Sequence, residues 1–311
     1  MTCRRCNHVV RRFGTYGKRR IQRYRCISCK ITFSEPAPKV GTHYTDPETV
    51  AKALAMMLEG MSVRAISRLT GLHMHTILSL LTTAATKARA VLDARVQNIT
   101  PRYVQMDELW GFVHTREPHL SDTDPGEWGS VYIWLAIDSE SKLLITHHLG
   151  GRNSVAAHAF VSDLRKRTTG RYQVTSDQLN AYVGAMREYF GKNVDFGQLH
   201  KIYGRLQTEN WYGGGQVIGA IPHVKIGRPE WNRISTSHVE RANLSVRMHL
   251  RRLTRLTNAF SKKLENLQAA VTLYVAFYNF CRVHQTVKAT PAMAAGLTDH
   301  VWSVAELLAS A

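Results

Sequence analysis

The sequence of 311 residues predicts an α/β protein in which two small modules precede a larger domain with a mixed sheet. Three observations lead to this prediction. Paired cysteines open the chain, helix-periodic apolar residues then surround a glycine turn, and strand-like segments farther on end in acidic residues. We expect the first module at residues 1–35, a linker at 36–45, the second module at 46–98, the large domain at 99–285 and a C-terminal tail at 286–311.

The chain is strongly basic, which narrows the partners to consider. Its 41 Lys and Arg residues outnumber 23 Asp and Glu residues, for a formal net charge of +18 at pH 7. Polyanions, nucleic acids first among them, suit such a surface. No apolar run reaches the roughly 18 residues of a membrane span, and no signal-peptide core follows the start. We therefore expect an intracellular protein with no membrane partner.

Two cysteine pairs at the start of the chain predict a metal-stapled ribbon. Cys3-x-x-Cys6 and Cys26-x-x-Cys29 are separated by 19 residues, a spacing typical of a four-thiolate zinc site. Zinc would be structural here, because four protein ligands leave no open position for substrate. It would also supply folding energy, since about 30 residues cannot build a stable apolar core unaided. The alternative is a pair of disulfides or a purely structural knob. The ribbon is rich in basic residues that would contact the DNA backbone, among them Arg4, Arg5, Arg19 and Arg20.

Residues 46–98 predict a helix-turn-helix. Asp46-Pro47 is a typical helix start, Ser62 caps a second short helix, and Gly71 lies in a tight turn before a third. The N-terminal end of the third helix would present three residues to base edges, namely His73, His75 and Thr76. The alternative is an ordinary three-helix packing unit.

From Tyr103 onward, strands and helices alternate and deliver acidic residues. The expected order is a strand that ends in Asp107-Glu108, a hairpin of two strands, a helix, a short strand that delivers Asp177, and a second helix. The expected strands are 103–108, 130–137, 142–149 and 172–176. The first helix is expected at 154–168, and the second helix follows the last strand and ends at about residue 189. This order can gather carboxylates at one sheet edge. Such a cluster would repel itself unless Mg²⁺ neutralises it.

A later segment has one carboxylate at the head of a basic helix. Glu240 is followed by no other acid until Glu265, and the basic residues between them include Arg241, Arg247, Arg251, Arg252 and Arg255. Surface helices usually alternate charges of opposite sign. On a continuous helix, Glu240, Arg247 and Arg251 fall within roughly 40° of one another. The pattern suits an acid that holds a metal ion beside phosphate-binding guanidinium groups. The alternative is a solvated cationic helix with one stray glutamate.

These features together resemble the DDE transposases of the insertion-sequence-one family. The matching motifs are Met106-Asp107-Glu108-Leu109-Trp110, Thr175-Ser176-Asp177, Val239-Glu240-Arg241-Ala242-Asn243-Leu244-x-x-Arg247 and Asn258-Ala259-Phe260-Ser261-Lys262. The resemblance spans nearly the whole chain. It implies a ribonuclease-H-like catalytic domain at 99–285, with an insertion at about 191–236, in which Asp107, Asp177 and Glu240 bind two Mg²⁺ or Mn²⁺ ions.

The resemblance also implies an activity. A transposase of this kind cleaves DNA at the ends of its element and transfers the strand to target DNA, using a metal pair for in-line displacement. Terminal inverted repeats and target DNA would be the partners, a homodimer or larger assembly the functional form, and the bacterial cytoplasm, in association with the nucleoid, the location. The alternatives are a zinc-containing transcriptional regulator and a nuclease that cuts without joining.

Two further acids compete for a place in the site. Glu108 adjoins Asp107, but neighbours on a strand point to opposite faces, so only one of them is expected to face the metal ions, and the resemblance favours Asp107. Asp138 is the best substitute acid, although a hairpin turn is where an ordinary aspartate belongs. Residues 191–236 fit either a DNA-contacting loop and strand pair or a satellite core.

Overall fold

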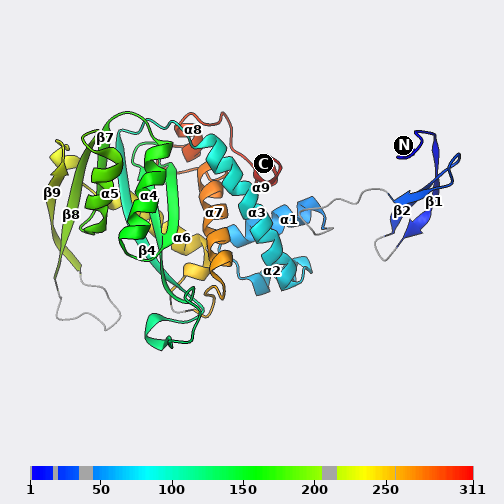
Figure 1. Ribbon diagram of the computed structural model, residues 1–311, viewed down its shortest axis with the longest axis horizontal. Coiled ribbons are helices and arrows are strands. Elements are labelled where there is room, and N and C mark those ends of the chain that lie inside the picture. Colours follow the sequence, from blue (N-terminus) through cyan, green and yellow to red (C-terminus); the bar gives the residue numbers. More distant parts are fainter. Residues whose placement is uncertain (1, 17–19, 35–44, 205–215, 256, 311) are drawn as a thin grey trace. The chain divides into compact units, whose positions relative to one another are not determined.

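A computed structural model describes residues 2–16, 20–34, 45–204, 216–255 and 257–310 (Figure 1). The chain forms two compact units, Met1–Val50 and Ala51–Ala311. The expected DNA contact Arg19, most of the 36–45 linker and the middle of the 191–236 segment lie outside the described residues. Among the described residues, no helix is both long and apolar enough to cross a bilayer.

The first unit contains a three-stranded antiparallel ribbon. Its strands are β1 (Val10–Tyr16), β2 (Ile21–Cys26) and β3 (Thr32–Ser34), in the order β1-β2-β3. Apart from two buried cysteines, the described side chains of the ribbon are at least partly exposed. Stacking of Tyr24 on Phe33, with ring centroids 6.2 Å apart, and of two guanidinium groups against Phe13 contributes little buried area. The ribbon therefore depends on the cysteines for its stability.

Three helices follow as predicted for 46–98: α1 (Pro47–Leu58), α2 (Val63–Thr70) and α3 (Met74–Arg95). The Ser62 hydroxyl accepts a hydrogen bond from the amide of Ala65, which caps α2. Gly71 has φ of +71°, the left-handed conformation that ends α2 and turns the chain into α3. Buried Ile66 and Ile77 join the two helices in one core.

The second unit is built on a six-stranded mixed sheet with the order β6-β5-β4-β7-β8-β9. The strands are β4 (Tyr103–Val113), β5 (Gly129–Asp138), β6 (Leu144–Gly150), β7 (Tyr172–Asp177), β8 (Val194–Gly204) and β9 (Gln216–Ile226). The first three form an antiparallel meander, and β7 and β8 then run parallel to β4. This meander with parallel strands added beside its first strand is a ribonuclease-H-like arrangement, as the resemblance implied.

Helices cover both faces of the sheet. On one face, α4 (Ser154–Arg167) and α5 (Ala181–Phe190) pack over a buried aromatic core of Trp134, Phe160 and Tyr182 (Figure 1). The other face carries α6 (Ser237–His249) and α7 (Leu264–Phe280). Helix α7 also packs along α3, so the module of α1, α2 and α3 is joined to the sheet domain through a helical interface.

Three segments differ from the sequence predictions. Strand β4 runs five residues past Glu108, because Leu109 and Val113 continue the buried alternation. Strands β8 and β9 extend the central sheet, so they are not a satellite core. The expected tail contains α8 (Pro291–Ala294) and α9 (Val304–Ala309), and its Trp302 is buried with the ring centroid 4.7 Å from that of Phe280.

The basic helix is shorter than predicted. Helix α6 ends at His249, and Arg251–Leu253 forms a separate short 3₁₀ turn. The predicted common face of Glu240 and Arg251 is therefore wrong. The break occurs because Leu250 takes an extended conformation that turns the chain, after which Leu253 is buried against Gly111 of β4.

Candidate functional site

Two adjacent acids reach the same edge of strand β4. Asp107 lies on the α6 side, where its Oδ2 accepts a hydrogen bond of 2.8 Å from Nδ2 of Asn243. Glu108 lies on the α5 side, near the buried Tyr182. The two side chains can meet because pairing between β4 and β7 stops at Gln105, which leaves the edge of β4 open beyond that residue.

Asp177 completes a cluster at this open edge. It is the last residue of β7, and one carboxylate oxygen from each of Asp107, Glu108 and Asp177 lies within 4.8 Å of the other two. The prediction that only one of Asp107 and Glu108 could face such a site is wrong. Strand alternation does send their Cβ atoms to opposite faces, but an edge without a neighbouring strand lets both side chains bend around it.

The cluster is costly to ionise. Burial, followed by repulsion from Asp177, raises the pKa of Asp107 from 3.8 to about 6. The same two causes raise the pKa of Glu108 from 4.5 to about 7. The buried Tyr182 hydroxyl interacts with Glu108, but this contact lowers the pKa of Glu108 by less than burial and Asp177 raise it. Oxygen ligands crowded in this way fit a hard divalent cation, which would remove the repulsion.

Arg152 neutralises part of the cluster. Its Nε donates to Oε2 of Glu108 at 3.1 Å, and its Nη2 donates to Oδ2 of Asp177 at 3.0 Å. The residue lies in the Gly150–Asn153 connection between β6 and α4, and Asn153 caps α4 by accepting from the amide of Ala156. The sequence prediction missed Arg152, since no local pattern links it to acids 25 and 44 residues away.

Glu240 lies beside the cluster but is not within the 4.8 Å group. Its carboxylate is 43% exposed, forms an ion pair with Lys201 of β8 and accepts a hydrogen bond from the Thr236 hydroxyl. It is near enough to contribute to the raised pKa of Asp107. Asn243, one turn later on α6, holds Asp107, so Glu240 and Asn243 share the helix face turned toward the acids.

A buried glutamine fixes the start of α6. Oε1 of Gln105 accepts hydrogen bonds from the amides of His238 and Val239, at 2.8 and 3.2 Å. Two of the amides left unpaired at the helix N-terminus are thereby satisfied. Because Gln105 lies two residues before Asp107 on the same face of β4, it sets the position of Glu240 relative to Asp107.

The arginines of the basic segment divide into two groups. Arg247 donates to the carbonyls of Leu253 and Trp110, both at 2.9 Å, and burial lowers its pKa to about 10. Arg252 donates to the Ser261 hydroxyl, and burial lowers its pKa to about 10 as well. The structure leaves three exposed, namely Arg241, Arg251 and Arg255.

Asp138, the substitute acid, is in the hairpin turn between β5 and β6. Its Oδ2 accepts from the amide and the hydroxyl of Ser141, and its Oδ1 accepts from the amide of Glu140. These bonds account for the carboxylate as a turn-forming group.

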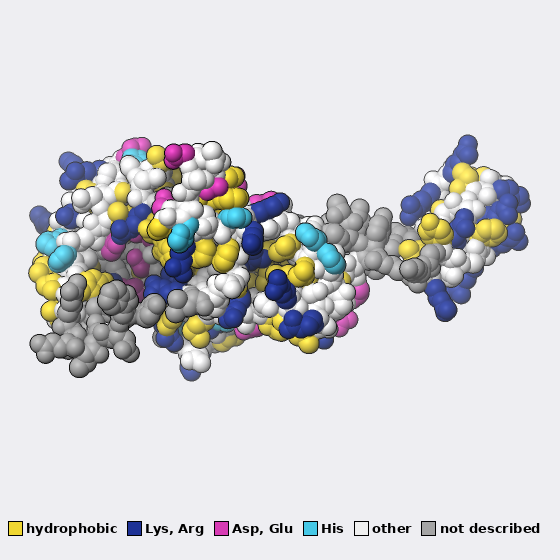
Figure 2. All heavy atoms as spheres, turned by 90° about the horizontal axis from the view of Figure 1, so that it is seen from below, with side chains coloured by type: hydrophobic (Ala, Val, Ile, Leu, Met, Phe, Trp, Pro, Cys, Tyr) yellow, Lys and Arg dark blue, Asp and Glu magenta, His cyan; other side chains and the backbone are white. Residues whose placement is uncertain are grey.

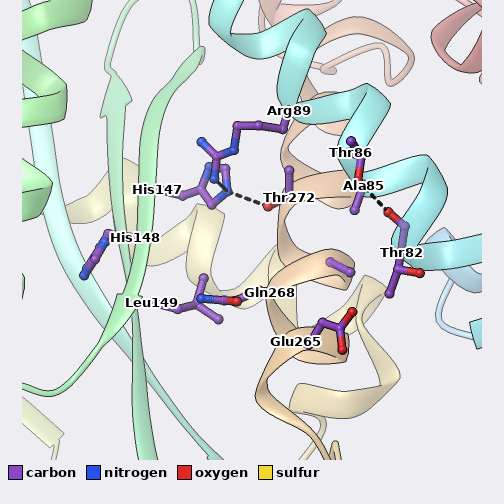
Figure 3. Close-up of a pocket in the computed structure, with 11 residues that line it drawn as sticks. Thr82, Ala85, Thr86, Arg89, His147, His148, Leu149, Glu265, Gln268 and Thr272 are labelled. Carbon is purple, nitrogen blue, oxygen red and sulfur yellow. Dashed lines mark hydrogen bonds between the residues drawn. The ribbon is translucent and has the colours of Figure 1, made fainter. Parts of the chain in front are cut away.

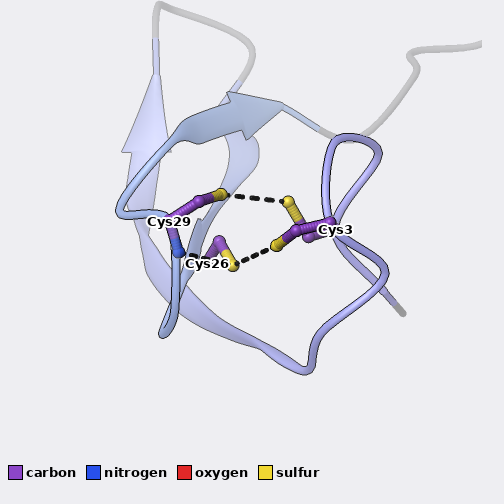
Figure 4. Close-up of side chains that lie close together, drawn as sticks. Cys3, Cys26 and Cys29 are labelled. Carbon is purple, nitrogen blue, oxygen red and sulfur yellow. Dashed lines mark hydrogen bonds between the residues drawn. The ribbon is translucent and has the colours of Figure 1, made fainter.

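The four ribbon cysteines converge on one point (Figure 4). Sγ of Cys3 lies 3.5 Å from Sγ of Cys29, and Sγ of Cys6 lies 3.4 Å from Sγ of Cys26. Tetrahedral zinc with Zn–S bonds of about 2.3 Å would place sulfurs about 3.8 Å apart, so the group fits a zinc ion. Hydrogen bonds from the backbone at Arg5 and Cys6 lower the pKa of Cys3 to about 6. Nearby Arg4, Arg5 and Arg20 are exposed.

The residues expected to contact base edges lie at the start of α3. His73 is the N-cap residue, and its ring stacks on that of His75 with centroids 5.3 Å apart. Both histidines are exposed, and Thr76 is partly exposed. The three side chains are therefore accessible at the N-terminal end of the helix.

A separate pocket of about 440 Å³ lies between α3, β6 and α7 (Figure 3). Its floor is His147, whose Nε2 lies 3.1 Å from Arg89 and 3.0 Å from the Thr272 hydroxyl. Burial lowers the pKa of His147 to about 3, so the ring is neutral and its Nε2 accepts the hydrogen bond from the guanidinium of Arg89. The contacts tie α3 and α7 to the sheet, and the pocket is not lined by Asp107, Glu108, Asp177 or Glu240.

Comparison of the sequence with models of known families and with curated proteins finds no match. Among solved structures, the chain is similar to a piggyBac transposase synaptic complex with hairpin DNA, at a TM-score of 0.39 and 9% identity over 89% of this chain and 73% of that chain. It is also similar to the Mos1 strand transfer complex, with a TM-score of 0.22 and 15% identity over 53% of this chain and 59% of that chain. For a Mos1 paired-end complex, the TM-score is 0.21 and the identity is 13%, over 53% of this chain and 60% of that chain. At these scores, the fold assignment rests on the strand order given above.

Proposed function

We propose that the protein is a DNA transposase that cleaves the ends of a mobile element and joins them to target DNA. The main support is the cluster of Asp107, Glu108 and Asp177 at the open edge of a ribonuclease-H-like sheet. The chain also has a formal net charge of +18, which suits a polyanionic substrate. Figure 2 shows acidic side chains in a small group beside Lys and Arg side chains.

Asp107, Asp177 and Glu240 would hold the divalent cations, Mg²⁺ or Mn²⁺, with Glu108 as a neighbouring carboxylate. When bound, such ions activate water or a 3′-hydroxyl and stabilise the leaving oxygen during in-line displacement. Asn243 keeps Asp107 oriented, because its amide occupies one carboxylate oxygen. Arg152 and Lys201 balance the acids by direct ion pairs.

The remaining residues would bring the DNA to this site. Exposed Arg241, Arg251 and Arg255 would contact phosphates near the cluster. Arg247 and Arg252 were also expected to do so, but their hydrogen bonds give them a role in holding β4 and the 3₁₀ turn together. The start of α3 would read bases, and the ribbon, held by zinc on its four cysteines, would add affinity for the DNA backbone. Because two element ends must be processed together, we expect a homodimer or a larger assembly.

The direct test is to incubate the purified protein, with and without Mg²⁺, with duplexes that carry the terminal repeats of its own element, and to size the products. Asp177→Asn should abolish cleavage while leaving specific binding nearly intact. Asp299→Asn is the matched control, because it makes the same change on a side chain that is 95% exposed. Cleavage that persists in Asp177→Asn would reject the proposed site.

The product sizes also separate the alternatives. Cut ends without joined products would identify a nuclease, and specific binding without any cutting would identify a transcriptional regulator.

A further inference from the structure

A row of partly exposed aromatic side chains continues from the carboxylate cluster along β4. Trp110 and Phe112 follow Glu108 at two-residue spacing, so the three side chains point to the same face, and Trp110 lies about 7 Å along the strand from Glu108. The ring centroids of Trp110 and Phe112 are 5.8 Å apart, and those of Phe112 and Phe260 are 4.9 Å apart. We call Trp110, Phe112 and Phe260 the aromatic strip.

The strip is left uncovered by the way the sheet ends. Strand β7 stops at Asp177, and the β4–β5 pair continues beyond it to Val113. The opposite face of this extension is tightly packed, since a Cβ on Gly111 would lie 2.9 Å from Cδ2 of Leu253. All three rings of the strip remain partly exposed on their own face.

The strip is anchored by a hydrogen bond at Trp110 and flanked by positive charge. Nε1 of Trp110 donates to the Ser130 hydroxyl at 3.2 Å, which fixes the orientation of the indole. The guanidinium of Arg116 lies 5.7 Å from the centroid of Phe112, and the ammonium of Lys262 lies 5.6 Å from that of Phe260. At the other end, Arg152 bridges Glu108 and Asp177. Aromatic rings interleaved with cations are the surface that binds unpaired nucleic-acid strands.

We propose that the aromatic strip stacks with unpaired nucleobases of the DNA strand whose phosphate lies at the carboxylate cluster. This inference rests on the proposed function, because it takes DNA to be the substrate of that cluster. Bases inside a duplex stack on one another, so rings of the strip can take bases only where the strands have separated. Since every base has a π-face, the contact would be tolerant of sequence.

The test compares binding to unpaired and paired DNA in the full-length, zinc-loaded protein. The probes are a fluorescein-labelled single strand of about 15 deoxythymidines and a duplex of the same length, followed by fluorescence anisotropy. Salt of about 0.2 M reduces the contribution of backbone contacts made by the basic modules. Trp110→Ala should weaken single-strand binding by about 5-fold or more and leave duplex binding unchanged.

Three variants keep the result interpretable. Trp110→Phe keeps an aromatic face and should retain most of the affinity. Phe260→Ala should also weaken single-strand binding. It replaces Trp110→Ala as the test of the strip if thermal melting shows that Trp110→Ala is unfolded. Trp231→Ala is the matched control, because it removes a tryptophan that is 59% exposed and not part of the strip.

The outcomes separate this inference from the proposed function. If the wild type cleaves element ends but neither Trp110→Ala nor Phe260→Ala changes single-strand binding, the aromatic strip is not a base-stacking surface and the transposase proposal stands. If single-strand binding depends on the strip but no cleavage occurs with Mg²⁺, the stacking surface stands and the proposed activity fails. An equal loss in Trp231→Ala would also overturn the inference.

Discussion

Replacing Glu108 with glutamine should stabilise the metal-free protein at alkaline pH. Its side chain is only 2% exposed, and burial together with the charge on Asp177 raises its pKa from 4.5 to about 7. A carboxyl whose folded-state pKa is raised opposes folding once it must ionise. The penalty is absent below pH 4.5, grows as the pH rises through the interval, and is complete above pH 7.

The magnitude follows from the two pKa values. Each pKa unit corresponds to 1.36 kcal/mol, so at pH 8 Glu108→Gln should be more stable than the wild type by about 3 kcal/mol. At pH 4 the two proteins should be equally stable, since glutamine resembles a protonated glutamate. Taking the difference in the free energy of unfolding between variant and wild type cancels the contributions of other titrating groups, such as the buried His147.

The assay is urea unfolding followed by tryptophan fluorescence between pH 4 and pH 8, in Mg²⁺-free buffer without chelator so that the ribbon keeps its metal. Glu127→Gln, on an exposed loop, controls for loss of a surface charge. Adding Mg²⁺ at pH 8 should stabilise the wild type and reduce the difference in stability between it and Glu108→Gln. A stability difference that does not change with pH, or a variant that is less stable at pH 8, would show that ionised Glu108 carries no such penalty.

Two further predictions concern the cysteine ribbon and the basic segment after Glu240. Cys26→Ser should lower the zinc content measured by elemental analysis and weaken DNA binding, whereas Cys281→Ser, outside the ribbon, should retain zinc; an unchanged zinc content in Cys26→Ser would contradict the four-thiolate site. Arg247→Ala should destabilise the fold by about 3 kcal/mol, because it removes two charged hydrogen bonds to partly buried backbone carbonyls. It should leave the salt dependence of DNA affinity unchanged. Arg241→Ala should reduce the slope of log DNA affinity against log salt concentration by about 1, without loss of stability. If instead Arg247→Ala reduced this slope and Arg241→Ala destabilised the fold, Arg247 would be the residue that contacts phosphate.

Much of the architecture is readable from local patterns. Ser62 and Gly71 mark the limits of α2, because a capping hydroxyl and a left-handed glycine act on their own immediate neighbours. A run of apolar residues identifies the buried strand β5, and the acid at the end of β7 is visible as Asp177. Alternation of buried residues continues through Leu109 to Val113, so the true length of β4 was also present in the sequence.

The rest depends on which elements become neighbours. Strand alternation alone separates Asp107 from Glu108, and only the end of the β4–β7 pairing at Gln105 lets them meet. Helical periodicity places Arg251 beside Glu240, but Leu250 leaves the helix and breaks that relation. Arg152 and Lys201, the cations that balance the acids, come from segments with no local signal for this role.

The sequence by itself therefore determined the order of ribbon, helix-turn-helix and α/β domain, the cysteine group and two acids of the cluster. Each of these follows from residue types and spacings that act over a few positions. The tertiary structure alone decided that Glu108 joins Asp107 and Asp177, and that Arg152 and Lys201 form ion pairs with the acids. It also decided that the aromatic strip lies next to the carboxylate cluster. The physical reason is that an open strand edge, an ion pair across the sheet and an uncovered face exist only after distant segments have packed together.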